Sequence, residues 1–337
     1  MEKGVTKMRK YLNGLGATVA AVAMLGMVTA AHAEKVRIAG NFPSDHSSSQ
    51  AMKIFKEEVE KATKGELTVD LFPDMQLGGA QENIDQVRSG TVFATWISIA
   101  FLSRTVPELE AVSLPFVFAN RDQAFRVMDG KVGELLDKKL ADKGYTSLGY
   151  MELGSRNVTN SVRPLKTLAD FKNLKVRLQP NETHIATFRA IGANPVSMDI
   201  KEVYSALQQG VLDGQENPYS IIETRRFDEV QKYLSDSGHF FDFIIIAANK
   251  RKFEGFKPEV KDAVRAAMAK SIAWQRKKAA DEDIAARDTL IKRGMQFDSI
   301  SADVRAELTK ATSDVVGGLR KKIGSDIIDA VMAEARK

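Results

Sequence analysis

The feature that most constrains the fold of this 337-residue chain is a long stretch without a helix-breaking residue. It runs from Glu259 to Arg293, between Pro258 and Gly294. Pro is favourable at the first position of a helix, and Gly is favourable just past the last. A continuous helix of this length would span about 50 Å, more than the diameter of a typical domain. Two interpretations are open: two helices joined by a kink, or one helix lying across two lobes.

Within this stretch, apolar side chains recur at helical spacing and predict a buried stripe. They are Val260, Val264, Met268, Ile272 and Trp274. The acidic run Asp281-Glu282-Asp283 is interpreted as a solvated helix face in preference to a metal site.

Residues 1–33 are typical of a secretory signal peptide. Four basic residues precede an apolar run from Leu15 to Ala30, and Ala31 and Ala33 suit a cleavage site after Ala33. A membrane anchor is the alternative, but the run carries Gly and Thr and is shorter than the roughly 20 residues that a span needs. Met8 is an alternative start. We therefore expect an exported protein.

The charge and the cysteine content fit this expectation. The whole chain has 49 basic and 44 acidic residues. Removal of residues 1–33 leaves 45 basic and 43 acidic residues, so the mature protein is nearly neutral. The chain has no Cys, which excludes disulfides, Cys-ligated zinc, iron–sulfur clusters and thiol nucleophiles. We expect a soluble periplasmic protein.

The order of predicted elements indicates an α/β protein with a parallel sheet. The first part predicts strands at 36–39, 67–71 and 92–99 and helices at about 51–62, 80–89 and 122–143. The second part predicts strands at 145–153, 174–178, 211–216 and 240–248 and helices at about 183–191 and 200–209. The apolar run 114–118 contains Pro115, so it is an irregular buried segment or an edge strand. Two α/β lobes follow, and ligands of such folds bind between lobes or at the carboxyl ends of strands.

The common catalytic and cofactor-binding motifs are absent from the sequence. His46, His184 and His239 are far apart and lack the spacing of metal ligands. No basic run interleaved with aromatic residues suggests nucleic acid. We expect no catalytic residue, no cofactor and no metal.

The polar candidates cluster between residues 154 and 218. Arg177 lies on the strand 174–178, and Arg156 follows Gly154 and Ser155. A guanidinium can bind a carboxylate with two parallel hydrogen bonds, but either Arg could equally be a solvated or salt-bridged residue. The block 213–218, Asp-Gly-Gln-Glu-Asn-Pro, is either part of a binding site or simply a β-turn.

Three segments resemble the periplasmic solute-binding subunit of TRAP transporters, the DctP family. They are Gly192 to Met198, Glu202 to Pro218 and Phe227 to Leu234, supported by Phe72 to Gly78 and Leu174 to Arg177. The resemblance covers essentially the whole mature chain. It implies two α/β lobes with cross-over strands and a long helix spanning both, with lobe I at 34–155 plus about 243–282 and lobe II at 156–242 plus about 283–337.

The resemblance also implies a substrate-binding site. Arg177 matches the arginine that pairs with the substrate carboxylate, and Asn217 matches the asparagine that bonds the same group. Arg156 matches a second, more variable arginine. Further expected lining residues are Asn41, Ser98, Gln81, Glu216, His46 and Ile200. Ser98 and Ile200 depart from the residues of sialic-acid binders, which argues against that ligand.

The implied function is capture of an organic acid anion and its delivery to the TRAP membrane permease subunits, through transient contact only. A sugar acid such as a hexuronate is preferred as the ligand over a C4-dicarboxylate, and keto and aromatic acids are further alternatives. The alternative functions are an ABC-type binding protein, a ligand sensor and a carboxylate-processing enzyme, which would need a base such as His46 or Glu216 near the clamp.

Overall fold

The computed structural model describes residues 33–337. The expected signal peptide lies outside this part of the chain, except for Ala33. The described strands are β1 (Glu34–Gly40), β2 (Leu67–Phe72), β3 (Ala94–Ser98), β4 (Tyr145–Asn160), β5 (Lys175–Leu178), β6 (Asn194–Ser197), β7 (Gly214–Asn217), β8 (Tyr233–Asn249) and β9 (Gln296–Ser299). No helix among the described residues combines the length and the apolar character that crossing a membrane requires.

The α-helices include all the predicted ones and several short helices that the sequence did not predict. They are α1 (Ser47–Ala62), α2 (Ala80–Ser89), α3 (Ile99–Leu102), α4 (Arg121–Met128), α5 (Lys131–Asp142), α6 (Glu182–Ala190), α7 (Ile200–Gln208), α8 (Tyr219–Thr224), α9 (Lys250–Gly255), α10 (Pro258–Lys292), α11 (Ala302–Ala311), α12 (Ser313–Ile323) and α13 (Asp326–Ala335). Short 3-10 helices are η1 (Pro107–Val112), η2 (Leu168–Phe171) and η3 (Phe227–Glu229).

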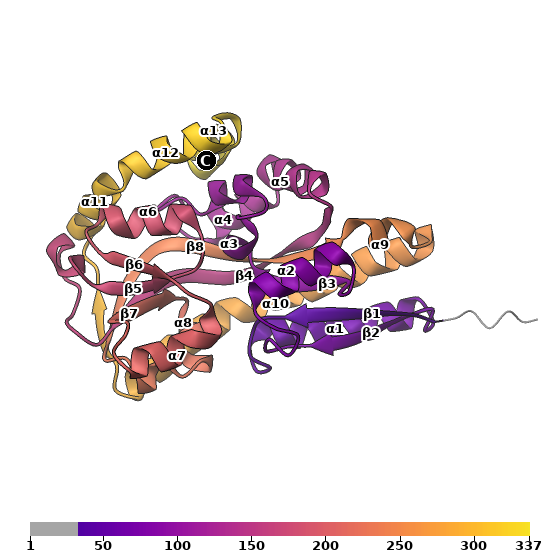
Figure 1. Ribbon diagram of the computed structural model, residues 1–337, viewed down its shortest axis with the longest axis horizontal. Coiled ribbons are helices and arrows are strands. Elements are labelled where there is room, and N and C mark those ends of the chain that lie inside the picture. Colours follow the sequence, from indigo (N-terminus) through magenta and orange to yellow (C-terminus); the bar gives the residue numbers. More distant parts are fainter. Residues whose placement is uncertain (1–32) are drawn as a thin grey trace, which may run out of the picture.

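All nine strands belong to one mixed sheet, with the order β2-β1-β3-β8-β4-β7-β5-β6 and β9 beside β8. β1 is parallel to β2 and β3 in one half, and β5 is parallel to β6 and β7 in the other. The long strands β4 and β8 are antiparallel to each other and pass from one half to the other. Figure 1 shows these two strands as the centre of the molecule, with the helices around both halves. The predicted two-lobe α/β fold with cross-over strands is confirmed.

Residues 258–292 form the single helix α10, so the interpretation of one helix spanning both halves is correct. Of the predicted stripe, Val260, Val264 and Met268 are buried, whereas Ile272 and Trp274 are only partly buried. Val260, Val264 and Met268 pack with α1 in the first half, whereas Ala286 and Leu290 pack with residues of α7 and α8 in the second. Because one rigid element belongs to two hydrophobic cores, it holds the halves together.

The acidic run at 281–283 differs from the predicted solvated face. Asp281 is exposed, but the Glu282 carboxylate accepts a hydrogen bond from the Ser47 backbone N–H at 3.1 Å. The Asp283 carboxylate accepts one from the Ser220 N–H at 3.3 Å. These bonds satisfy N–H groups at the starts of α1 and α8, which lie in different halves. Two successive side chains of α10 therefore anchor both halves.

Two further predictions need correction. The helix predicted over 122–143 is two helices, α4 and α5, separated at Asp129 and Gly130. A Cβ at Gly133 would overlap the Met128 carbonyl oxygen, so the chain turns tightly there and only Gly fits. The run 114–118 forms neither a helix nor a strand, which agrees with the irregular alternative.

The C-terminal helices return to the first half. α13 packs against α4, α5 and η1, and Ile328 and Val331 join the core that contains Leu136 and Leu140. In Figure 1, α11 to α13 form an arc from the second half back to α4. We therefore propose that α13 belongs with lobe I, although the sequence-based division placed everything after about residue 283 in lobe II.

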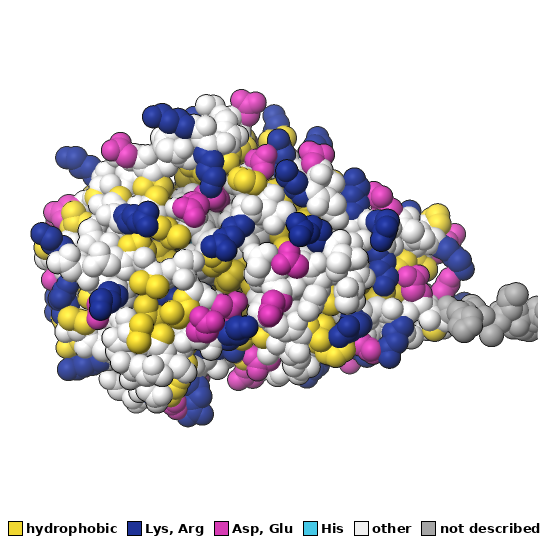
Figure 2. All heavy atoms as spheres, in the orientation of Figure 1, with side chains coloured by type: hydrophobic (Ala, Val, Ile, Leu, Met, Phe, Trp, Pro, Cys, Tyr) yellow, Lys and Arg dark blue, Asp and Glu magenta, His cyan; other side chains and the backbone are white. Residues whose placement is uncertain are grey.

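The surface carries both signs of charge. Figure 2 shows Lys and Arg side chains interspersed with Asp and Glu over the face in view. A mixed surface creates only a weak long-range field. Any strong attraction for an anion must come from local groups.

We predict that Asp283 makes the stability of the protein depend on pH. Burial raises the pKa of this carboxyl to about 7, although the Ser220 hydrogen bond opposes the rise. An unfolded Asp titrates near pH 4, so the folded state binds more protons between pH 4 and 7. The free energy of unfolding therefore falls as the pH rises through this window. Asp283→Asn keeps an acceptor for Ser220 and should lose less stability than the wild type over that range.

Urea unfolding of both proteins at several pH values would measure this difference. Asp281→Asn, an exposed neighbour on the same helix, is the control and should follow the wild type. Parallel profiles for all three proteins would contradict the prediction.

Candidate ligand-binding site

A small cavity lies between the two halves of the sheet. Its walls come from the first half, the cross-over strand β4 and the second half, and the lining residues are Asn41, Phe42, Ser98, Phe101, Leu153, Gln179, Ile200, Asn217, Ile221 and Arg225. Several of these residues lie at or just beyond the carboxyl ends of β1, β3, β5 and β7. Such ends are where open α/β sheets bind ligands, because the loops there diverge and leave room.

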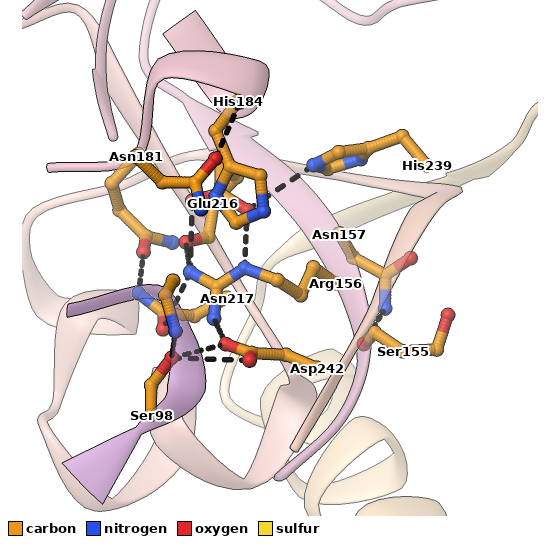
Figure 3. A network of polar contacts seen from close by, with 12 residues as sticks. Ser98, Ser155, Arg156, Asn157, Asn181, His184, Glu216, Asn217, His239 and Asp242 are labelled. Carbon is orange, nitrogen blue, oxygen red and sulfur yellow. Dashed lines mark hydrogen bonds and ion pairs between the residues drawn. The ribbon is translucent and has the colours of Figure 1, made fainter. Parts of the chain in front are cut away.

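Beside this cavity, Arg156 is the centre of a buried polar network (Figure 3). Its side chain is completely buried and donates to both carboxylate oxygens of Glu216, with Nη2 and Oε1 2.8 Å apart. Nη1 donates to Asp242 Oδ2 at 2.9 Å, and Nη2 donates to Asn217 Oδ1 at 3.1 Å. Ser98 Oγ donates to the same Asp242 carboxylate at 2.8 Å. The network thus connects β3, β4, β7 and β8.

The network leaves Arg156 electrically compensated. Burial alone would raise the pKa of Glu216, but Arg156 and a hydrogen bond from His239 lower it well below its usual range. Burial raises the pKa of Asp242, against the opposing effect of Arg156. Burial would lower the pKa of Arg156, yet the two carboxylates raise it. Arg156 therefore remains a cation that already has its counter-ions.

Arg177 differs sharply from Arg156, although it is equally buried. Its Nε donates to the Met198 carbonyl oxygen at 2.9 Å. Among the described residues, neither Nη1 nor Nη2 has a hydrogen-bond partner. Burial lowers the pKa of Arg177 to about 10, and the charge of Glu216 only partly offsets this. A buried cation with two unused donors is unfavourable unless an anion completes the site.

Arg177 adjoins the cavity without being one of its lining residues. Gln179, directly after the end of the same strand, lines the cavity, as does Ile200, two residues after the Met198 that Arg177 contacts. Arg177 also pairs in register with Gln215 of β7. Gln215 Oε1 accepts a hydrogen bond from Asn217 Nδ2 at 2.5 Å. Arg177 and Asn217 are therefore brought to the same region, as the resemblance implied.

The other expected site residues fall into two groups. Asn41, Ser98, Asn217 and Ile200 line the cavity, and Arg156 and Glu216 form the network next to it. Gln81 and His46 are placed elsewhere.

Gln81 is exposed on α2 and does not line the cavity. His46 is buried and stacks on Phe42, one layer behind the lining. Its Nδ1 accepts from the Ser48 N–H at the start of α1. Burial, with the nearby Arg225, lowers the pKa of His46 to about 3, so the ring is neutral at physiological pH.

The sequence analysis missed several residues of this region. For two of them, the sequence contains a pattern that could have predicted a place in the site. Asp242 is a single acidic residue inside the apolar run 240–248, and a buried carboxylate requires a cationic partner. Gln179 follows Arg177 at the spacing that places both on one face of a strand. Phe42, Phe101 and Arg225 had no such signal.

Arg225 connects the two halves across the cavity. It follows α8, and its Nη2 donates to the Asn41 carbonyl oxygen at 2.8 Å. Its Nη1 forms an ion pair with Asp74 at 3.0 Å. This lining cation is therefore already neutralised from the opposite side of the cavity.

A larger, open groove of about 760 Å³ lies elsewhere along β4 and β8 and is lined in part by Arg121, Glu152, Asp283 and Arg305. Arg121 pairs with Glu152 at 2.7 Å, and Asp283 anchors α8. Because the unpaired buried donors are beside the smaller cavity, we place the candidate site there.

We predict opposite effects on stability for the same substitution at the two buried arginines. Arg156→Met leaves Glu216 and Asp242 buried without a cation and should lower the free energy of unfolding by about 3–5 kcal/mol. Arg177→Met removes a buried cation that makes no ion pair of its own among the described residues and should leave the free energy of unfolding unchanged or raise it.

Urea unfolding of ligand-free protein at pH 7 would measure both effects. Equal losses in the two variants would contradict the distinction between a compensated and an uncompensated arginine.

Comparison with known proteins gives a consistent result. The sequence pattern described as "Bacterial extracellular solute-binding protein, family 7" (DctP) matches residues 38–322. The chain is 34% identical over 306 residues to the 2,3-diketo-L-gulonate-binding periplasmic protein of Escherichia coli, covering 89% of this chain and 92% of that protein. It is 32% identical to the C4-dicarboxylate-binding periplasmic protein of Rhodobacter capsulatus, covering 95% and 97%. The crystal structure of a TRAP periplasmic solute-binding protein from Sulfitobacter sp. NAS-14.1 with bound β-D-galacturonate superposes with a TM-score of 0.86 at 30% identity, covering 89% and 100%.

Proposed function

Since the chain belongs to the DctP family of TRAP solute-binding proteins, we propose that it binds an organic acid anion in the cavity between its lobes, through Arg177, and delivers it to the membrane permease. The observation that carries this proposal is the completely buried Arg177 guanidinium, whose two terminal nitrogens lack partners among the described residues. The proposal treats the protein as a carrier that changes nothing in its ligand.

A carboxylate is the group that best completes Arg177. Its two oxygens match the parallel N–H groups of a guanidinium, and the resulting pair of hydrogen bonds is charge-assisted. In a site shielded from water this pair is stronger than on the surface. The ligand would supply the direct ion-pair partner that Arg177 lacks among the described residues.

Asn217 is the second group that we assign to the carboxylate. Arg156 donates to its Oδ1, and this bond fixes Nδ2, with its two N–H groups, as the donor end of the amide. In the described structure Nδ2 donates to Gln215, from where it can turn to a carboxylate held by Arg177. Arg156 then acts as a positioning residue, which revises its expected role as a direct partner of the ligand.

The cavity draws its walls from both lobes, so ligand binding and lobe closure are coupled in this proposal. A ligand stabilises the closed arrangement only through contacts that the open arrangement lacks. Arg177 and Asn217 are in lobe II, and Asn41 and Ser98 are in lobe I. A ligand that reaches both sets favours closure, and the closed form is the one that we propose docks on the permease.

The cellular location follows from the family and the leader together. Members of this family bind solutes in the periplasm. Export by the expected signal peptide, with cleavage after Ala33, remains a prediction because residues 1–32 lie outside the described structure.

A thermal-shift screen of the mature protein against a library of organic acids tests the proposal directly. A ligand raises the unfolding midpoint by mass action, by an amount that grows with the logarithm of the ratio of its concentration to its Kd. Stabilisation by one class of carboxylic acids, without chemical turnover of the acid, is the expected result. Absence of stabilisation by every acid would refute it.

For the acid found in this way, we predict that Arg177→Met weakens binding by about two orders of magnitude or more, because the carboxylate loses its buried partner. Arg177→Lys keeps a positive charge but loses the paired N–H geometry, so it should restore only part of the affinity. Isothermal titration calorimetry measures both.

The matched control is Arg226→Met, since Arg226 is a largely exposed arginine of the same lobe. Its affinity should equal that of the wild type. Unchanged binding in Arg177→Met would exclude Arg177 as the carboxylate partner.

A further inference from the structure

The Asn41 side chain presents a hydrogen-bond acceptor to the cavity. Its neighbours determine that the atom is the amide oxygen and not the amide nitrogen. Asn83 Nδ2 donates to the Leu77 carbonyl oxygen at 3.2 Å. A carbonyl oxygen can only accept, so the Asn83 amide must have its nitrogen on that side. Its Oδ1 is therefore the atom that faces Asn41, and it accepts from Asn41 Nδ2 at 2.9 Å.

This chain of hydrogen bonds determines the orientation of Asn41 as well. Because Nδ2 is used toward Asn83, the remaining atom is Oδ1, a pure acceptor. Asn41 is 7% exposed and lines the cavity, and its Oδ1 has no hydrogen-bond partner among residues 33–337. The Oε1 of Gln179, another lining residue, is a second buried acceptor without a partner in that part of the chain.

The unused polar atoms of this region are therefore of two kinds. Arg177 offers two donors, which require an acceptor such as a carboxylate. Asn41 and Gln179 offer acceptors, which require donors. A buried polar atom left without its partner destabilises a complex, so a well-matched ligand must bring a carboxylate and also hydrogen-bond donors.

The charges of the region point in the same direction. The region holds two buried cations, Arg156 and Arg177, and two buried carboxylates, Glu216 and Asp242. Glu216 acts on both arginines, and Asp242 pairs with Arg156. These four charges sum to zero, and Arg225 is neutralised separately by Asp74. One ligand carboxylate therefore gives this buried region a net charge of about −1, and a dianion would double it. A second negative group is increasingly unfavourable where water is excluded.

Ser98 and Asn217 belong to the Arg156 network. The other lining residues are apolar: Phe42, Phe101, Leu153, Ile200 and Ile221. Such walls accommodate a carbon skeleton but satisfy no polar group. Asn41 and Gln179 therefore have to select the polar groups on that skeleton.

From these observations we infer that the site is specific for a monocarboxylate that carries hydroxyl groups and discriminates against a dicarboxylate of the same length. The inference rests on the proposed function, since it assumes that Arg177 binds the carboxylate. A ligand hydroxyl donates to Asn41 Oδ1, whereas the second carboxylate of a dicarboxylate at neutral pH has only acceptor oxygens and repels that atom. Sites with polar partners for a hydroxyl discriminate strongly against ligands that lack it.

Calorimetric titration with acids of matched length tests this inference. The four-carbon set is butyrate, succinate and 2,3,4-trihydroxybutyrate, and the six-carbon set is hexanoate, adipate and galactonate. In at least one set, the hydroxylated monoacid should bind about tenfold or more tightly than both of its partners. Equal or tighter binding of the dicarboxylate, or of the acid without hydroxyls, would overturn the inference and leave the proposed function intact.

Failure of every acid, here and in the thermal-shift screen, would instead overturn the proposed function, and this inference with it. The two failures are therefore distinguishable.

The variant Asn41→Leu assigns the discrimination to one atom. It should bring the ratio of affinities for the hydroxylated acid and the dicarboxylate of the same length close to one. A merely structural role of Asn41 would weaken all acids equally and leave this ratio unchanged, and that result would overturn the assignment. Gln81→Leu, at an exposed position of the same lobe, is the matched control and should retain the wild-type ratio.

Discussion

The site of this protein depends on the buried ion cluster in which Arg156 holds Glu216 and Asp242. Each of these charges would be strongly destabilising alone in a region closed to water. Together they satisfy one another, and their hydrogen bonds join β4, β7 and β8, with Ser98 adding β3. The cluster also orients Asn217. It therefore builds a rigid polar wall at the point where both lobes share the sheet.

The pairing of Arg156 in this cluster distinguishes it from Arg177, which makes no ion pair among the described residues. Both arginines are completely buried, and both are in the segment that the sequence singled out. The available carboxylates are bound by Arg156, which leaves Arg177 as a cation with two unused donors. A pre-organised cation that makes no ion pair of its own allows a binding site to gain affinity from an anion without first breaking a pair within the protein. In this proposal Arg156 contributes to the stability of the fold, and Arg177 contributes to ligand binding.

The sequence predicted the elements of the fold better than the contacts of the site. Helix α10 was predictable because Pro258 and Gly294 delimit it and no breaker lies between. The break between α4 and α5 was not predictable, because it depends on the close approach of Gly133 to the Met128 carbonyl oxygen.

For the site, the sequence and the resemblance pointed to Arg177, Asn217 and Asn41. They could not predict that Arg156 pairs with Asp242. Its partner Asp242 is distant in sequence and arrives through the pairing of β4 with β8. In the same way, Glu282 and Asp283 looked solvated because their partners, the starts of α1 and α8, are brought there only by the tertiary fold. Local patterns determine where side chains lie on an element, and tertiary packing determines what they contact.

The same contacts limit where the lobes can move in the proposed closure. Helix α10 is attached to both lobes, through Glu282 to α1 and through Asp283 to α8, so little bending is expected along it. The strands β4 and β8 are less uniform, because their pairing shifts between Glu152 and Gly154 and again after Arg156. Gly154 has a φ of 116°, a conformation that side-chain-bearing residues rarely adopt. Two of the three irregular points in the pairing of β4 with β8 therefore lie next to Arg156. In the proposed closure, bending at these points would act on the residues that orient Asn217.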